Sequence, residues 1–477
     1  MATYLKPQPG ATPPLIAPIL AEFAANLRFD AIPPHIRERA KHLMLDAAGI
    51  ALASTRFDFA RRSLSALTAL AGLDSAAGDS VVIGFPQRLP LRDAVQMNGI
   101  LVHGLDFDDT HVPGVIHATA SAFSCALGVT AKLKNSGQQL ITAYVLGIEI
   151  AARLGAVAKG GFHQVGFHPT SLIGAFSCAL QSGRLFDLTP QQLSMAQGIA
   201  LSVAAGSMEF LADGAWTKRM HPGWAGVGGI TAASLAQQGF IGPAAAYEGR
   251  FGLYASHLGA LLKDCDFTLA TAGLGERWEL EQVAVKPFPA CHFTHACADA
   301  ALNLRERGIR VEDIVKVRAL IPQEVITTVC EPVASKKRPA NSYDAQFSIP
   351  YAVAVSFLRG KFGLAELEDE AREDAAILAL AAKVDYEIDP NSGFPKYYSG
   401  EVIITTRDGT EHRHREHINR GAAERPISAQ DIVRKFMGNA ELAVSRARAE
   451  VIRDVMLTMD TRDAHSVAET LAAQEKP

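Results

Sequence analysis

The stretch HIRERAKHLMLDAAGIALAS, residues 35–54, decides the fold class. Its apolar residues Ile36, Ala40, Leu43, Met44 and Ala47 recur at spacings of three and four, which places them on one face of a helix. Similar Ala/Leu/Gly-rich stretches follow at 94–105, 119–134, 139–158, 170–186, 190–211 and 225–238. Their small residues predict helices that pack closely on one another. Within this half of the chain, only residues 81–85 have the pattern of a short strand.

The pattern changes near residue 275. Residues 278–285 and 314–321 alternate apolar and polar side chains as half-buried strands do, and 294–307 has helical spacing. Residues 400–407 and 411–416 flank Asp408-Gly409, a dipeptide suited to a hairpin turn, and helical spacing returns from 428. We therefore expect a mainly α protein. Residues 1–274 and 416–477 would form a large all-α helical domain, and residues 275–415 an inserted smaller α+β lid domain.

Composition narrows the class of protein. The chain has 477 residues, of which 48% are hydrophobic and 20% charged, as in a globular protein with a large core and two domains. A net charge of −4 gives no overall attraction to nucleic acid or to anionic membranes. The first apolar stretch, 15–25, contains Pro18 and Glu22, so it does not resemble a signal peptide, and no membrane span is expected.

The cysteines indicate the compartment and exclude some cofactors. Six cysteines are scattered along the chain and none forms a CxxC pair. This spacing argues against a disulfide framework and against a zinc or iron–sulfur site. A reducing, cytoplasmic location is therefore expected.

Residues 103–117 contain the first of four clusters whose side chains could take part in catalysis or substrate binding. Three carboxylates, including Asp106, follow an apolar helix together with His103, Thr110 and His117. Such a cluster can contain a general base and the acidic partner that orients it. A helix cap with a solvated loop, or an Asp/His metal site, are the alternatives.

The second cluster is the Gly-rich segment 160–171, which places His168 just before a helix. Helix N-terminal amides there could hold a carboxylate. A loop histidine that bonds only the backbone is the alternative.

Basic residues mark the third cluster, 217–224. Lys218, Arg219 and His221 stand at a helix start, where the helix dipole disfavours cations, so an anion is expected beside them. An exposed basic loop is the alternative. The glycines that follow do not match a dinucleotide motif and instead favour close helix packing.

The fourth cluster, 286–295, contains two prolines that fix an extended loop carrying Lys286, Cys291 and His292. We interpret Cys291 as a small buried residue rather than a nucleophile. The tract His412-Arg-His-Arg-Glu-His417 could suggest a metal site, but a solvated edge strand explains it better.

Together these clusters resemble the MmgE/PrpD family. The runs 105–110, 167–171, 214–219, 286–291 and 345–351 are similar to family signatures in the family's order, and the resemblance covers essentially the whole chain. It implies a helical domain, a smaller lid domain, a pocket between them, a homodimer, and no metal or organic cofactor. Known members include 2-methylcitrate dehydratase, cis-aconitate decarboxylase and an iminodisuccinate epimerase, which all act on a bond beside a carboxylate.

The resemblance also implies a site. A decarboxylase-type site maps onto Asp106, Thr110, His117, His168, Lys218 and Lys286, and one family histidine falls at Cys291, directly before His292. This departure favours a dehydratase or epimerase over a decarboxylase. As catalytic residues we expect Asp106, Thr110, His117, His168 and Lys218; Lys218, Arg219, Lys286, Cys291 and His292 would bind substrate.

The hypothesis is a lyase, most simply a hydro-lyase, that acts on a small di- or tricarboxylate. The cations would stabilise charge that builds on a carboxylate as the adjacent proton leaves. His168 or His117 would be the general base and the other the general acid, with Asp106 orienting one imidazole. An epimerase, a decarboxylase and a non-catalytic carboxylate-binding protein are the alternatives.

Overall fold

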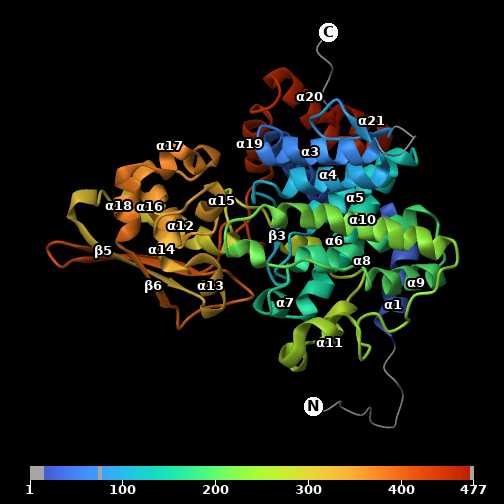
Figure 1. Ribbon diagram of the computed structural model, residues 1–477, viewed down its shortest axis with the longest axis horizontal. Coiled ribbons are helices and arrows are strands. Elements are labelled where there is room, and N and C mark those ends of the chain that lie inside the picture. The colour runs from blue at the N-terminus through green and yellow to red at the C-terminus, as the bar shows by residue number, and fades with distance from the viewer. Residues whose placement is uncertain (1–14, 73–77, 473–477) are drawn as a thin grey trace.

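A computed structural model describes residues 15–72 and 78–472. Figure 1 shows a large helical part beside a smaller part that contains the main sheet. The mainly α class expected from the sequence is confirmed.

The helical part contains helices from both ends of the chain. They are α1 (Ile16–Asn26), α2 (Pro34–Ser54), α3 (Asp58–Ala71), α4 (Leu91–His103), α5 (Ala118–Lys132), α6 (Gly137–Val157), α7 (Gly161–Gln164), α8 (Pro169–Leu185), α9 (Pro190–Ala200), α10 (Thr217–Gln237) and α11 (Leu253–Leu258), joined by α19 (Ala429–Ala440), α20 (Arg446–Leu457) and α21 (Ala464–Leu471) from the end of the chain. Both α19 and α20 pack on α2, so the two ends of the chain share one hydrophobic core. By length and composition α6 could cross a membrane, but 94% of its apolar window is buried in the protein.

The α+β part has its own hydrophobic core. Its elements are α12 (His295–Glu306), β5 (Ile314–Ile321), α13 (Ile326–Val329), α14 (Val333–Lys337), α15 (Ser342–Gln346), α16 (Ile349–Arg359), α17 (Asp369–Arg372), α18 (Ala375–Ala382), β6 (Val384–Ile388), β7 (Gly400–Thr406) and β8 (Glu411–Glu416). The strand order is β6-β5-β7-β8, with β5 and β6 parallel and the other pairs antiparallel. His412 and His414 lie on β8, which is an edge strand as expected.

Three expected elements differ from the sequence prediction. The helix expected at 190–211 ends at Ala200, because the chain then leaves to pair Ser207 with Phe167. The strand expected at 278–285 is mostly a 3₁₀ turn, since the Leu280 amide donates to the buried carboxylate of Glu149 instead of to a strand. The strand expected at 81–85 is only β1 (Ser80–Val81), paired with β2 (Arg88–Leu89).

The fourth difference concerns the first residue of α10, which is Thr217 and not residue 225, so the basic cluster 217–224 stands at a helix start as expected and forms the first turns of that helix. Glycines bring α10 close to its neighbours. A Cβ at Gly99 of α4 would lie 2.4 Å from the backbone nitrogen of Gly223, and a Cβ at Gly229 would lie 2.4 Å from the Cβ of Cys178 in α8. The close packing expected from these glycines therefore brings α4, α8 and α10 together, and their ends carry the site.

Candidate active site

The segment between α4 and α5 is held from three directions. Its short strand β3 (Thr110–His111) pairs with β4 (Val283–Ala284). Gln346 of the α+β part donates to the carbonyl oxygen of Leu105, and Lys435 of α19 donates to that of Phe107 at 2.8 Å. Asp106 adopts a left-handed backbone conformation with φ of 49°, which turns the chain at this point. The segment is thus a fixed frame and not a solvated loop.

Asp106 joins two lysines from distant parts of the chain. Its Oδ1 atom accepts from the ammonium of Lys218 at 2.9 Å and from that of Lys286 at 2.8 Å, and Lys286 also donates to the Asp106 backbone carbonyl. Burial would raise the pKa of this carboxyl, but the two ammonium groups hold it well below its usual range. Asp106 is therefore a carboxylate, and the anion expected beside the basic cluster is part of the protein.

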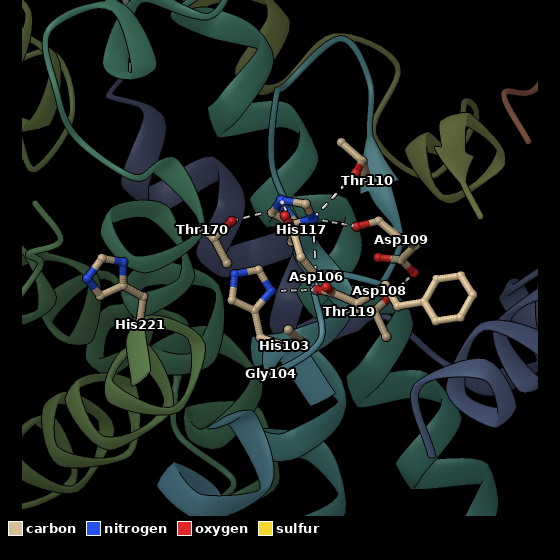
Figure 2. A network of polar contacts seen from close by, with 12 residues as sticks. His103, Gly104, Asp106, Asp108, Asp109, Thr110, His117, Thr119, Thr170 and His221 are labelled. Atoms are coloured by element: carbon tan, nitrogen blue, oxygen red, sulfur yellow. Dashed lines mark hydrogen bonds and ion pairs between the residues drawn. The ribbon is translucent and has the colours of Figure 1, made fainter. Parts of the chain in front are cut away.

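His117 has a defined tautomer. Its Nδ1 atom lies 2.8 Å from the carbonyl oxygen of Asp109, which can only accept, so Nδ1 carries the ring proton (Figure 2). Its Nε2 atom lies 4.0 Å from Oδ1 of Asp106. Burial, aided by the charge of Lys286, lowers the pKa of His117 well below its usual value. The ring is thus neutral with a lone pair on Nε2, which is the form of a general base.

His103 and Asp108 form a buried pair behind His117. Figure 2 shows the contact between His103 and Asp108, in which Nδ1 of the histidine lies 2.8 Å from Oδ2 of the aspartate. The ring centroids of His103 and His117 are 4.8 Å apart. Burial lowers the pKa of His103, while the same histidine helps to hold the pKa of Asp108 below its usual range against the effect of burial. Neither His103 nor Asp108 is among the residues expected in the site, although both stand in the first cluster, 103–117.

His168 is the residue before α8, and its ring contacts a second histidine. Its Nδ1 atom lies 2.9 Å from Nδ1 of His221 in α10, and its Nε2 atom is buried without a protein partner. Burial, followed by the effect of His221, lowers the pKa of His168 well below its usual value. His168 therefore presents a free Nε2 atom and does not bond only the backbone.

His117 and His168 line one pocket, whose volume is about 420 Å³ including the part open to solvent. It is lined by Thr110, Val115, His117, His163, His168, Met208, Phe210, Lys218, Cys291, His292, Phe293, Phe347 and Tyr398. Both parts of the protein contribute, so the pocket lies between them. Its lining combines Lys218 and four histidines with residues that are mostly aromatic or aliphatic.

Three residues expected in the site do not line this pocket. Asp106 and Lys286 lie behind Lys218, where Lys286 has no exposed surface. Arg219 points elsewhere: its guanidinium lies over the rings of Phe59 and Tyr343, and its Nε donates to the carbonyl of Gly104. Lys286 therefore acts through Asp106, and Arg219 anchors the start of α10.

Cys291 and His292 do line the pocket. Burial raises the pKa of the Cys291 thiol to about 11, so the group is neither a thiolate nor a strong acid near neutral pH. Nε2 of His292 lies 2.8 Å from the side-chain amide nitrogen of Asn419, which donates a hydrogen bond to it.

Sequence reasoning missed His163, Phe210, Phe347 and Tyr398. His163 stands in the Gly-rich segment 160–171 and Phe347 in the family-like run 345–351, so both had a signal in the sequence, whereas Phe210 and Tyr398 come from segments with none.

Among residues 15–72 and 78–472, two groups of side chains have an arrangement that could accept a metal ion. The ligand atoms of His103, His117 and His168 lie within 4.8 Å of one another, as do those of Asp106, Asp108 and His117. In the second group, Asp106 already carries two ammonium groups on one oxygen, which opposes a further cation there. The first group contains only neutral imidazoles.

Comparison with known proteins identifies the family of this chain. The MmgE/PrpD N-terminal domain model matches residues 19–263, and the MmgE/PrpD C-terminal domain model matches residues 288–461. The chain belongs to the MmgE/PrpD family.

Among its relatives in this family, human cis-aconitate decarboxylase is 27% identical, over 95% of this chain and 93% of its own. The cis-aconitate decarboxylase of Aspergillus terreus is 25% identical, over 92% of each chain. The 2-methylcitrate dehydratase of Salmonella typhimurium is 25% identical over 74% of each chain. These relatives are lyases, and this MmgE/PrpD protein is an enzyme of that class.

Proposed function

We propose that this MmgE/PrpD protein is a cofactor-independent, dehydratase-type lyase that removes a proton next to a carboxylate of a small di- or tricarboxylate. The observation that carries the proposal is the neutral His117, which lines the pocket with Lys218 and whose unprotonated Nε2 lies 4.0 Å from Oδ1 of Asp106, the carboxylate that pairs with Lys218. A base next to a fixed ammonium is the pairing that this proton transfer needs.

Lys218 is the pocket's permanent cation. A substrate carboxylate would bind its ammonium through a charge-assisted hydrogen bond. When His117 takes the adjacent proton, negative charge moves onto that carboxylate, so Lys218 stabilises the transition state more than the bound substrate. Asp106 and the buried Lys286 keep Lys218 in place.

His168 suits the acid role. It lines the same pocket as His117, with ring centroids 6.0 Å apart, and its Nε2 atom is free to face a ligand. In a dehydration, Nε2–H would protonate the leaving hydroxide, which departs as water.

Decarboxylation is the second candidate, because the cis-aconitate decarboxylases match over a larger share of the chain than the dehydratases do. The neutral thiol of Cys291, where the resemblance implies a histidine, weighs against it. An epimerase would use the same base and acid without loss of water.

A panel of hydroxy acids and cis-aconitate, followed by proton NMR in deuterated water, distinguishes these reactions. We expect a hydroxy acid to lose water and give an unsaturated acid. Itaconate and carbon dioxide from cis-aconitate would favour the decarboxylase, and deuterium uptake without loss of water the epimerase. Exhaustive chelation tests cofactor independence: activity that is lost and then restored by one metal would overturn it.

We also propose a homodimer that works in the cytoplasm and binds neither nucleic acid nor membranes. Trp216, which directly precedes α10, and Met220 and Trp224 within it are exposed at four-residue spacing and form an apolar stripe. Light scattering during gel filtration measures the oligomeric state.

A further inference from the structure

The contact between His168 and His221 is fixed by the fold. Their Nδ1 atoms lie 2.9 Å apart, so one ring donates its proton to the other. The His168 amide donates to the carbonyl of Gly206, and the hydroxyl of Ser171 donates to the carbonyl of His221. Each imidazole therefore sits on an anchored piece of backbone, one before α8 and one in α10.

Both rings are neutral near pH 7. Burial lowers the pKa of His221 to about 3 and that of His168 well below its usual value. The charged or titratable groups that face the pair are Lys218, His103 and His117, and each lowers the pKa of His168 further. Phe210 packs edge-on against both rings and covers the contact. Two neutral imidazoles in this contact hold one proton between their Nδ1 atoms.

The position of that proton decides what His168 offers the substrate. If His221 donates it, His168 carries its own proton on Nε2 and is an acid. If His168 donates it, Nε2 has a lone pair and is a base. Because Nε2 of His168 is buried and unpartnered, either form would act on a ligand in the pocket.

We propose that His221 is the second proton site of a relay that serves His168, a positioning role that rests on the proposed function. When Nε2 of His168 gives its proton to the leaving hydroxide, the Nδ1 proton of His221 moves to Nδ1 of His168. In the same step His221 takes a proton at its own Nε2 from a water molecule, so neither ring becomes an anion. The hydroxide that this water leaves is neutralised by the proton that His117 took from the substrate and releases to solvent.

The pairing can be tested without a substrate. In protein labelled with ¹⁵N-histidine, the signals of His168 are identified by their loss in His168→Gln. We expect His221→Ala to shift both nitrogens of His168, because the shared proton has lost its second site. The surface variant His412→Gln should leave them unchanged. Unaltered His168 nitrogens in His221→Ala would overturn the pairing.

The relay is tested with a substrate found in the acid panel. His221→Ala should lower kcat by about 100-fold, the scale of a general acid, and should change KM little because Lys218 still binds the carboxylate. Imidazole in the buffer should restore part of the loss by filling the space that His221 leaves. His412→Gln should keep the wild-type kcat, and imidazole should not alter it.

A kcat of His221→Ala within two-fold of the wild-type value would contradict the relay. So would a loss of kcat that imidazole does not change in a protein that is folded by circular dichroism. If no acid is turned over by the wild type, the proposed function fails, whereas the NMR measurement still decides whether the two rings share a proton.

Discussion

Asp106 compensates two buried ammonium groups with one carboxylate. Replacing it with asparagine keeps its shape and tolerates the left-handed backbone, but leaves Lys286 without a counter-charge. We expect Asp106→Asn to lower the free energy of unfolding by about 3–5 kcal/mol, as when one partner of a buried ion pair is removed. Urea denaturation measures the change.

Asp385→Asn is the matched control. Asp385 pairs with Lys337 at 2.8 Å but is largely exposed, so its loss should cost about 1 kcal/mol or less. Equal losses for the two variants would mean that the Asp106 cluster is not a buried charge network.

Lys218 and Arg219 are adjacent cations with different positions. Lys218 lines the pocket, whereas Arg219 lies between aromatic rings. Lys218→Ala should lower kcat/KM at least about 100-fold, because it removes a fixed charge from the transition state. Arg219→Lys should keep kcat/KM within about three-fold and change mainly stability. Steady-state kinetics with one acid substrate compare them, and similar losses in both would place Arg219 in the site after all.

At the scale of elements, the approach of α8 and α10 sets the distance between His168 and His221. A side chain at Gly229 would meet Cys178 and the backbone of Ala179. Gly229→Val should therefore lower stability by about 1–3 kcal/mol through overpacking, and should lower kcat as the helices separate. Thermal unfolding and kinetics measure the two effects.

Gly438 in α19 is the control for this substitution, because nothing lies within 4 Å of a Cβ built there. Gly438→Ala should leave kcat unchanged and raise stability by up to about 1 kcal/mol. A well-tolerated Gly229→Val would show that α8 and α10 can separate without consequence.

The elements also show what the sequence can and cannot predict. Helical spacing predicted α2 and apolar/polar alternation predicted β5, whereas the turn dipeptide Asp408-Gly409 predicted the hairpin of β7 and β8. Alternation also predicted a strand at 278–285, and this prediction was wrong. The cause is a distant contact: the Glu149 carboxylate in α6 accepts a hydrogen bond from the Leu280 amide.

The residues of the site also divide into those that sequence motifs predict and those that only the tertiary structure reveals. His117, His168 and Lys218 stand in motifs and line the pocket, whereas the roles of His221 and Arg219 depend on which way neighbouring side chains of one helix point. Tyr398 reaches the pocket from the α+β part, and only the tertiary structure brings it there.

For the whole molecule, buried neutral histidines predict how stability depends on pH. Burial lowers the pKa of His163 to about 4 and that of His221 to about 3, and those of His103, His117 and His168 also fall. The unfolded chain binds protons at these five rings below pH 6.5 and the folded chain does not, so the rings lower stability as pH falls. Burial raises the pKa values of Asp109 and Glu149 to about 7, which acts in the opposite direction, but the five rings outweigh these two carboxyl groups. A ring that is still neutral at pH 5 costs about 2 kcal/mol.

Urea midpoints from pH 8 to pH 5 check this prediction. We expect a decline that begins near pH 6.5, well before carboxylates with lowered pKa values such as Asp106 take up protons. A flat profile down to pH 5 would contradict the burial of neutral imidazoles on which the site depends.

The central claim is that His117 removes a proton next to a substrate carboxylate in the pocket between the two parts of the protein. Its most direct test follows the acid panel by proton NMR in deuterated water with wild type and His117→Gln. We predict that the wild type converts a hydroxy acid to an unsaturated acid, and that folded His117→Gln does so about 100-fold or more slowly. Equal rates for the two proteins would contradict the account.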